Sequence, residues 1–299
     1  MATGYLEIGD NNDGLIETLS DGTWTPIEAP LPADAASGQQ TSIDGVACPA
    51  VGTCVAVGGY LGHNGTPALI ETLSNGTWTP TAAPLPANAA ATPAAGLNGI
   101  ACPAVGTCVA VGVYTDKNNV YQGLVETLSN GAWAATELPR PSGAAGSKNV
   151  GLGSVSCPTA DNCVATGWYN YTSALHAYPS LIATLSARRW ATVGAPAPAG
   201  TSANRVFLGE VACSAPGSCL TAGSYNYTNP NNEGDGLAET LSRGKWTPVR
   251  IGAPASGATS NYFFGVACPA VGICMAAGAY YTASDDSIQG LIETTSRQS

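Results

Sequence analysis

Gly14-Leu-Ile-Glu-Thr-Leu-Ser20 decides the fold, because this phrase returns with small changes at residues 68–74, 123–129, 180–186, 236–242 and 290–296. A second motif, Cys48-Pro-Ala-Val-Gly-Thr-Cys54, alternates with it. The first cysteines of successive copies are 54, 55, 56 and 55 residues apart. A fixed period of this kind is the signature of a protein built from stacked structural repeats.

Each repeat predicts four short strands. The first covers 44–47 and ends at the first cysteine, the second begins at Cys54, the third covers 69–73 and the fourth begins at Trp78. Asp-Gly or Asn-Gly separates the third and fourth strands in three of the repeats and favours type I′ turns, in which both central residues have positive φ. Prolines at 26, 80 and 248 lie just inside the fourth strand. They favour an edge position, because proline lacks the N–H group.

Four-stranded repeats of this length are typical of β-propeller blades. We therefore expect an all-β protein in which residues 1–299 form a single propeller domain of antiparallel blades. The chain holds the last three strands of one repeat, four complete repeats and the first three strands of another, which makes 22 strands. This count predicts a six-bladed ring truncated at its N-terminus, with five blades as the alternative.

The composition excludes several classes of protein. Only 10% of the 299 residues are charged, and the net charge is −10, which argues against nucleic acid or an anionic membrane as the partner. Hydrophobic residues make up 44% of the chain, so it does not have the composition of a disordered protein. No apolar run approaches the roughly 18 residues of a membrane span. We expect a folded domain with no nucleic-acid partner and no membrane span.

All ten cysteines fall in five Cys-x5-Cys pairs. Zinc sites usually have closer pairs with further ligands nearby, whereas the two histidines, His63 and His176, lie in no ligand pattern. We therefore expect no metal site and five disulfides, each closing the hairpin between the first and second strands. The expected bonds are Cys48–Cys54, Cys102–Cys108, Cys157–Cys163, Cys213–Cys219 and Cys268–Cys274. Five disulfides indicate an oxidising compartment and hence a secreted or cell-surface protein. No cofactor is expected, with calcium at the oxygen-rich segments 10–14 and 231–236 as the one alternative.

The Val-Ala-Cys-Pro motif, followed by Cys-Val-Ala-Val-Gly and a Gly-Thr-Trp hairpin, resembles the repeat of secreted actinobacterial β-propeller proteins. The hairpin Ser20-Asp-Gly-Thr-Trp24 also resembles a shortened Asp-box of the sialidase (BNR) type. The resemblance covers essentially the whole chain and implies a propeller, a fold that carries many different activities. A sialidase would need three clustered arginines to clamp its substrate, and the arginines of this chain predict no such cluster.

Short uniform hairpins and longer variable connections alternate along the repeat, and the two kinds point to opposite ends of each blade. Variable connections on a rigid scaffold are the usual place for binding. Tyrosines that recur in register are expected to pack between blades: Tyr5, Tyr60, Tyr114, Tyr169, Tyr225 and Tyr280. Aromatic residues that break the register are the expected ligand contacts, because such rings suit flat hydroxylated ligands: Trp168, Tyr171, Tyr227, Tyr262 and Tyr281.

Carboxylates divide in the same way. A glutamate recurs inside the third strand of five repeats, and this repetition indicates a role in the scaffold: Glu17, Glu71, Glu126, Glu239 and Glu293. Acids outside the repeat are the candidates for catalysis: Asp44, Asp116, Glu210, Glu233, Asp235, Asp285 and Asp286.

Three functions are compatible with this sequence. The first is a secreted, non-catalytic propeller that binds carbohydrate or a cell-surface partner through the variable connections. The second is a glycoside hydrolase or lyase acting on polysaccharide, which needs two acids facing each other across a cleft. The third is a protein-binding adhesion scaffold.

Overall fold

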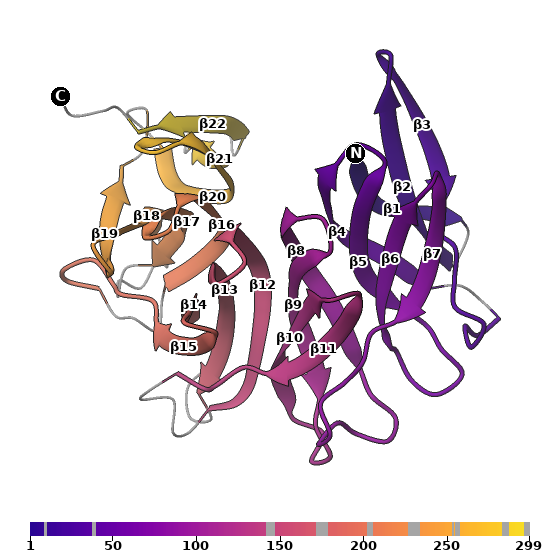
Figure 1. Ribbon diagram of the computed structural model, residues 1–299. Coiled ribbons are helices and arrows are strands. Elements are labelled where there is room, and N and C mark those ends of the chain that lie inside the picture. The colour runs from indigo at the N-terminus through magenta and orange to yellow at the C-terminus, as the bar shows by residue number, and fades with distance from the viewer. Residues whose placement is uncertain are drawn as a thin grey trace. The chain divides into compact units, whose positions relative to one another are not determined.

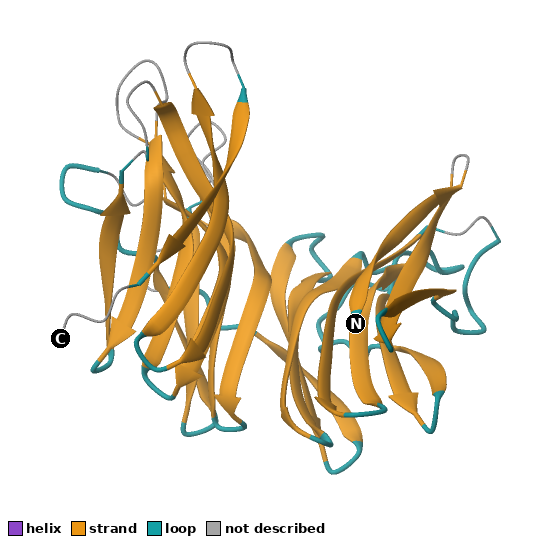
Figure 2. Ribbon diagram, turned by 90° about the horizontal axis from the view of Figure 1, so that it is seen from above, coloured by secondary structure: helices purple, strands orange, loops and turns teal. Residues whose placement is uncertain are grey.

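A computed structural model of the chain contains strands, turns and loops, and no helix among the described residues (Figure 2). The structure describes residues 1–8, 11–37, 40–141, 147–171, 179–201, 206–226, 234–252, 254, 258–282 and 287–295. In this part of the chain the strands form six antiparallel sheets (Figure 1). Two compact units contain them: Met1–Leu138 with Gly151–Gly153, and Pro139–Val150 with Ser154–Ser299.

The first unit contains three sheets. Sheet 1 consists of β1 (Ala2–Ile8), β2 (Asn11–Ser20) and β3 (Thr23–Glu28). Sheet 2 consists of β4 (Thr41–Ala50), β5 (Thr53–Tyr60), β6 (Ala68–Ser74) and β7 (Thr77–Ala82). Sheet 3 consists of β8 (Ala95–Ala104), β9 (Thr107–Thr115), β10 (Tyr121–Ser129) and β11 (Ala132–Glu137).

The second unit contains the other three sheets, except for Gly151–Gly153 of β12, which belong to the first unit. Sheet 4 consists of β12 (Ser147–Thr159), β13 (Asn162–Tyr171), β14 (Ser180–Ser186) and β15 (Arg189–Gly194). Sheet 5 consists of β16 (Val206–Ala215), β17 (Ser218–Asn226), β18 (Gly234–Ser242) and β19 (Lys245–Ile251). Sheet 6 consists of β20 (Ala258–Ala270), β21 (Ile273–Thr282) and β22 (Ile288–Thr294).

Strands that are consecutive in sequence are neighbours in every sheet, so the predicted division into repeats and the 22 predicted strands are confirmed in the described residues. Two tight turns lie at one end of each four-stranded sheet, which we call the hairpin end. The longer links lie at the other, which we call the connection end. Asn75 and Gly76 both have positive φ, at 51° and 78°, as the predicted turn requires. Pro80 lies on the edge strand β7, opposite Glu71.

The first strand of the repeat is longer than expected. We expected it to cover 44–47 and to end at Cys48, but β4 runs from Thr41 to Ala50. It continues because Ala50 still pairs with Thr53 across the turn. Bulges between Ile43 and Gly45 and between Ala47 and Ala50 interrupt the register, so the alternation of side chains in the sequence does not reveal the full strand.

All five predicted disulfides are present. Each joins two cysteines six residues apart within one sheet, across the hairpin between the first and second strands. The described residues contain no free cysteine. Each of sheets 2 to 6 therefore has one disulfide, which joins its first two strands at the hairpin end.

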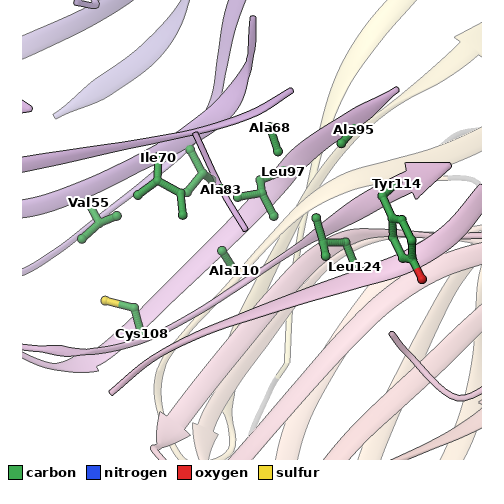
Figure 3. Close-up of a cluster of buried hydrophobic side chains, with 11 residues drawn as sticks. Val55, Ala68, Ile70, Ala83, Ala95, Leu97, Cys108, Ala110, Tyr114 and Leu124 are labelled. Carbon is green, nitrogen blue, oxygen red and sulfur yellow. The ribbon is translucent and has the colours of Figure 1, made fainter. Parts of the chain in front are cut away.

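Consecutive sheets within a unit pack face to face through the repeated apolar residues. Ile70 of sheet 2 and Leu97 and Leu124 of sheet 3 are fully buried in one cluster (Figure 3). In the second unit, Ile182 of sheet 4 packs with Leu237 of sheet 5 in the corresponding way. The Leu-Ile dipeptide of each repeat thus supplies one residue to each face of its sheet.

A repeated carboxyl group is buried beside these clusters. Glu71, Glu126 and Glu239 are fully buried, and none of their carboxyl oxygens has a hydrogen-bond partner among the described residues. Burial penalises the charged form and raises the pKa of each group to about 8. The predicted scaffold role is consistent with this burial, and the three side chains are neutral acids at neutral pH.

These three groups predict that stability increases toward acid. Their pKa is about 8 when folded, against an ordinary value of 4.5, so between these values the folded chain holds protons that the unfolded chain has lost. The contribution is fully present below pH 4.5 and is lost as the pH rises to about 8. Denaturant unfolding across this range measures it. Glu126→Gln should reduce the slope, and an unchanged slope would contradict this assignment.

Candidate functional site

The connection end of sheet 5 carries a polar constellation built from three strands. Tyr225 ends β17 and pairs with Asp235 at the start of β18, while Arg250 lies near the end of β19. The Tyr225 hydroxyl donates a hydrogen bond to Asp235 Oδ2 at 3.3 Å, and Arg250 Nε donates to the Tyr225 hydroxyl. Arg250 Nη2 lies 3.7 Å from Asp235 Oδ2, and the guanidinium carbon is 5.4 Å from the centre of the Tyr225 ring.

The three side chains of this constellation differ in burial. Tyr225 is fully buried, whereas the Arg250 side chain is 48% exposed and that of Asp235 is 25% exposed. The buried ring therefore fixes the position of a planar cation and a carboxylate that both reach solvent. Together they offer donors and acceptors in a fixed orientation.

Asn261 of the neighbouring strand β20 holds this end of sheet 5 in place. Its Oδ1 accepts from the Gly236 N–H at 2.6 Å, and its Nδ2 donates to the carbonyl oxygens of Ile251 and Gly252 at 3.0 and 3.2 Å. A side chain at position 236 would come within 2.4 Å of the Phe263 ring, so glycine is required there. The start of β18 and the end of β19, which flank Asp235 and Arg250, are thereby fixed.

Trp168 lies at the connection end of sheet 4, on the face that packs against sheet 5. It pairs with Ser180, whose hydroxyl accepts from the Leu208 N–H of sheet 5 at 2.7 Å. Ile182, two residues further on β14, belongs to the buried cluster that contains Tyr225. Trp168 is half-buried. The indole and the Arg250–Asp235 pair therefore belong to the two facing sides of the junction between sheets 4 and 5.

The repeated tyrosine has different partners in different sheets. The Tyr60 hydroxyl donates to Asp34 Oδ1 at 2.9 Å, and the Tyr114 hydroxyl lies 2.9 Å from both Asn88 Oδ1 and Glu137 Oε2. Burial, followed by these acidic neighbours, raises the pKa of both tyrosines. The predicted packing role is confirmed for three of the six tyrosines, which belong to buried clusters between sheets: Tyr60, Tyr114 and Tyr225. Tyr169 is also buried. Tyr280 is half-buried, and Tyr5 of sheet 1 is 59% exposed.

One position next to this tyrosine varies strongly. The residue four places after the repeated tryptophan is Glu28, Ala82, Glu137, Gly194 or Arg250. Arg250 belongs to no cluster of three arginines in the sequence, so the sialidase pattern does not identify it. The feature of the sequence that identifies Arg250 is its charge: this position, four residues after the repeated tryptophan, carries a positive charge in this repeat alone.

The other predicted aromatic contacts have mixed outcomes. Tyr262 and Tyr281 of sheet 6 lie together, with ring centres 5.8 Å apart, and Phe264 meets Tyr262 edge-on at 5.2 Å. A hydrogen bond with Tyr281, then burial, raises the pKa of Tyr262. Tyr171 ends β13, but its side chain lies outside the described part, as does the whole of Tyr227. Ligand contact by these five residues stays a prediction.

Each predicted acid among the described residues has its own local environment. Burial alone would raise the pKa of Asp116, but hydrogen bonds from the Val120 and Asn118 N–H groups and the Gln122 side chain hold it below its ordinary value. Asp116 therefore stabilises its own connection. Asp44 is exposed in the first unit, and desolvation raises its pKa against a hydrogen bond from Ser42. Glu210 is exposed in the second unit, where its carboxylate accepts from the Val266 N–H at 3.4 Å. Glu233, Asp285 and Asp286 lie outside the described residues.

Two hollows lined by described residues lie away from this constellation. One of about 340 Å³ lies between sheets 4 and 5 at the hairpin end; Val193, Leu241 and Trp246 help to line it, and no charged side chain does. One of about 230 Å³ lies on sheet 1 beside Asp13 and Glu28. Within the described ranges no group of three or more His, Cys, Asp or Glu side chains is arranged to hold a metal ion. The same residues include no helix long and apolar enough to span a bilayer.

No known family matches the sequence, and no curated protein matches it. The structure is similar to that of a protein of unknown function from Dyadobacter fermentans, at 12% identity over 96% of this chain and 84% of that one, with a TM-score of 0.54. It is also similar to the sialidase of Trypanosoma rangeli in complex with the inhibitor DANA, at 11% identity and a TM-score of 0.51. That alignment covers 96% of this chain and 50% of the sialidase, so the chain spans half of that protein. At these identities the likeness concerns the fold, and the chain is an all-β protein of the propeller kind.

Tyr225→Phe tests the internal support of the constellation. The substitution removes the hydroxyl that contacts both Asp235 and Arg250, and we expect it to lower the free energy of unfolding by about 1–2 kcal/mol. Denaturant unfolding measures the change. Tyr5→Phe, at an exposed tyrosine of sheet 1, should leave stability within about 0.5 kcal/mol of the unmodified chain. Equal effects of the two substitutions would contradict the role assigned to Tyr225.

Proposed function

We propose that this chain is a secreted, non-catalytic binding propeller that recognises carbohydrate at the connection end of sheets 4 and 5. The observation that carries the proposal is the half-exposed Arg250–Asp235 pair, held over the buried Tyr225 ring. A guanidinium donates hydrogen bonds in one plane and a carboxylate accepts them. A fixed pair of this kind suits neighbouring hydroxyl groups, which both donate and accept.

Trp168 supplies the second element of a sugar site. An indole offers a broad apolar face with a polar edge, which suits the C–H face of a pyranose ring. Trp168 lies on the side of the junction opposite the Arg250–Asp235 pair. The ligand we propose is therefore a neutral sugar ring that stacks on Trp168 and directs its hydroxyls toward Arg250 and Asp235.

A binding role fits these side chains better than hydrolysis. Glycoside hydrolysis uses two carboxyl groups on opposite sides of the scissile bond, and the carboxylate of this constellation lies beside a guanidinium. Secretion fits the five disulfides, which form and persist in oxidising compartments. The likeness to a sialidase fold is compatible with a carbohydrate ligand. We also propose that the six sheets are the blades of a six-bladed propeller ring.

A glycan array probed with the full chain tests the function, followed by titration of the strongest binder. Arg250→Ala should weaken binding about tenfold or more, because a charged hydrogen bond contributes roughly 1.5–3 kcal/mol. Trp168→Ala should weaken it several-fold. Arg188→Ala is the matched control, since Arg188 is an exposed arginine paired with Asp161 at 3.3 Å at the hairpin end. Binding of no glycan, or equal loss in Arg250→Ala and Arg188→Ala, would overturn the proposal.

A further inference from the structure

The hollow of about 340 Å³ between sheets 4 and 5 lies within the second unit, at the hairpin end. Arg250 and Asp235 belong to the other end of the same two sheets. The residues that line the hollow are mainly apolar, and none of them is charged. Small-molecule sites in proteins begin at about 300 Å³ and have mostly apolar and aromatic linings with a few polar groups. This hollow therefore has the size and the composition of a site for a small ligand.

The inner wall of the hollow is buried and covalently held. Val164 of β13 and Leu241 of β18 are 4% and 9% exposed and belong to the buried cluster between the two sheets. Cys163 and Cys219 also line the hollow, and each is part of a disulfide. This wall is therefore fixed before any ligand arrives, which reduces the entropic cost of binding.

The edge strand β15 supplies an outer wall on sheet 4. Ala191 and Val193 line the hollow, and Val193 pairs with Ile182, whose side chain packs against sheet 5. Both side chains therefore face sheet 5. Val193 is nevertheless 46% exposed, so an apolar surface is available inside the hollow.

This outer wall differs from the corresponding strands of the other repeats. Ala191 and Val193 stand one and three residues after the repeated tryptophan. Among the five repeats that carry this tryptophan, only theirs has no hydroxyl group at either position. The counterparts are Thr25 and Ile27, Thr79 and Thr81, Ala134 and Thr136, and Thr247 and Val249. Alanine is also smaller than the threonine of three other repeats, so sheet 4 leaves more room and a less polar surface here.

Trp246 lines the same hollow from sheet 5. It is half-buried and packs against the cluster that contains Val164 and Leu241. An indole favours a second aromatic ring in an offset-stacked or edge-to-face arrangement. The chain as a whole has a net charge of −10, but the lining has no charge that could pair with an ion, and an unpaired ion is costly to remove from water. The lining therefore favours a neutral aromatic ligand.

We propose that this hollow is a second binding site, which takes a small neutral aromatic molecule of one or two rings. The ring packs between Val193 of sheet 4 and Trp246 of sheet 5. A hydroxyl or ring N–H group of the ligand bonds to the polar side chains of the lining, which are Asn162, Thr184 and Ser186. The site lies at the opposite end of the sheets from the proposed sugar site and does not depend on it.

Saturation-transfer NMR and calorimetric titration of the full chain test this proposal with three probes. Indole is the neutral aromatic probe, cyclohexanol the neutral aliphatic one and benzoate the charged aromatic one. Indole should bind at a single saturable site, and the other two should bind more weakly. Ala191→Phe fills the hollow with a ring and should abolish indole binding. Ala191 is exposed, so this variant should keep the melting temperature of the unmodified chain.

Val193→Thr gives sheet 4 the residue that sheet 2 has at this position, with almost no change in shape. It should weaken indole binding about fourfold, as expected for the loss of one methyl contact. Val249→Thr is the matched control, because Val249 is the counterpart on sheet 5, is also 46% exposed and lies outside the hollow. It should bind indole like the unmodified chain. Arg250→Ala should do the same, which separates this test from that of the proposed function.

Four results would overturn the proposal. Absence of saturable indole binding, or unchanged binding in Ala191→Phe, means that the hollow is not an aromatic site. Equal binding of cyclohexanol or benzoate contradicts the proposed class of ligand. Equal losses in Val193→Thr and Val249→Thr place the binding elsewhere. If indole fails to bind but a tripeptide with a central tryptophan binds, the occupant is a protein side chain rather than a small molecule.

Discussion

Face-to-face packing of consecutive sheets is the interaction on which the rest of this structure depends. Each third strand is covered on both sides when its sheet has two neighbours, so its residues are apolar in succession rather than alternating. Leu69 and Ile70 of sheet 2 are adjacent in sequence, fully buried, and belong to different clusters. The following residue, Glu71, is buried among the same packed sheets, and this burial raises the pKa of its carboxyl group so that the group is neutral. A small stacked sheet cannot bury its apolar residues alone, which is why the repeat requires its neighbours.

The repeated and non-repeated residues have separate tasks. Repetition governs the turns, the disulfides, the apolar faces and the buried tyrosine, all of which recur because every sheet must pack in the same way. Variation is concentrated at the connection end, where the buried tyrosine of sheet 2 contacts Asp34, that of sheet 3 contacts Glu137, and that of sheet 5 contacts both Asp235 and Arg250. A rigid scaffold whose tyrosine contacts differ from sheet to sheet is a physical basis for specificity.

Much of the fold could be predicted from the sequence, because its determinants are local. Asn75-Gly76 adopts the expected turn, Pro80 lies on an edge strand, and Cys102 and Cys108 are close along one hairpin. The true ends of β4 could not be predicted, since they depend on bulges that only strand pairing reveals. Blade number and closure into a ring stay predictions.

The candidate site was less predictable for a different reason. Trp168 was identified because it breaks the register, but Arg250 acquires meaning only beside Tyr225, which precedes it by 25 residues. Asp116 was a plausible acid by type, yet its hydrogen bonds to Asn118, Val120 and Gln122 make it a structural residue. Sequence patterns identify what recurs, whereas a site depends on contacts between residues that do not.

Hydrogen exchange of the full chain, measured by mass spectrometry, tests most directly whether sheet stacking governs stability. The central strands β2, β5, β17 and β21 each have a hydrogen-bonded neighbour on both sides. They differ in stacking within their own units, since among the described residues sheets 2 and 5 each pack against two sheets of their unit, whereas sheets 1 and 6 each pack against one. Amides of β5 and β17 should therefore exchange at least about tenfold more slowly than those of β2 and β21. Equal protection of all four strands would contradict the account.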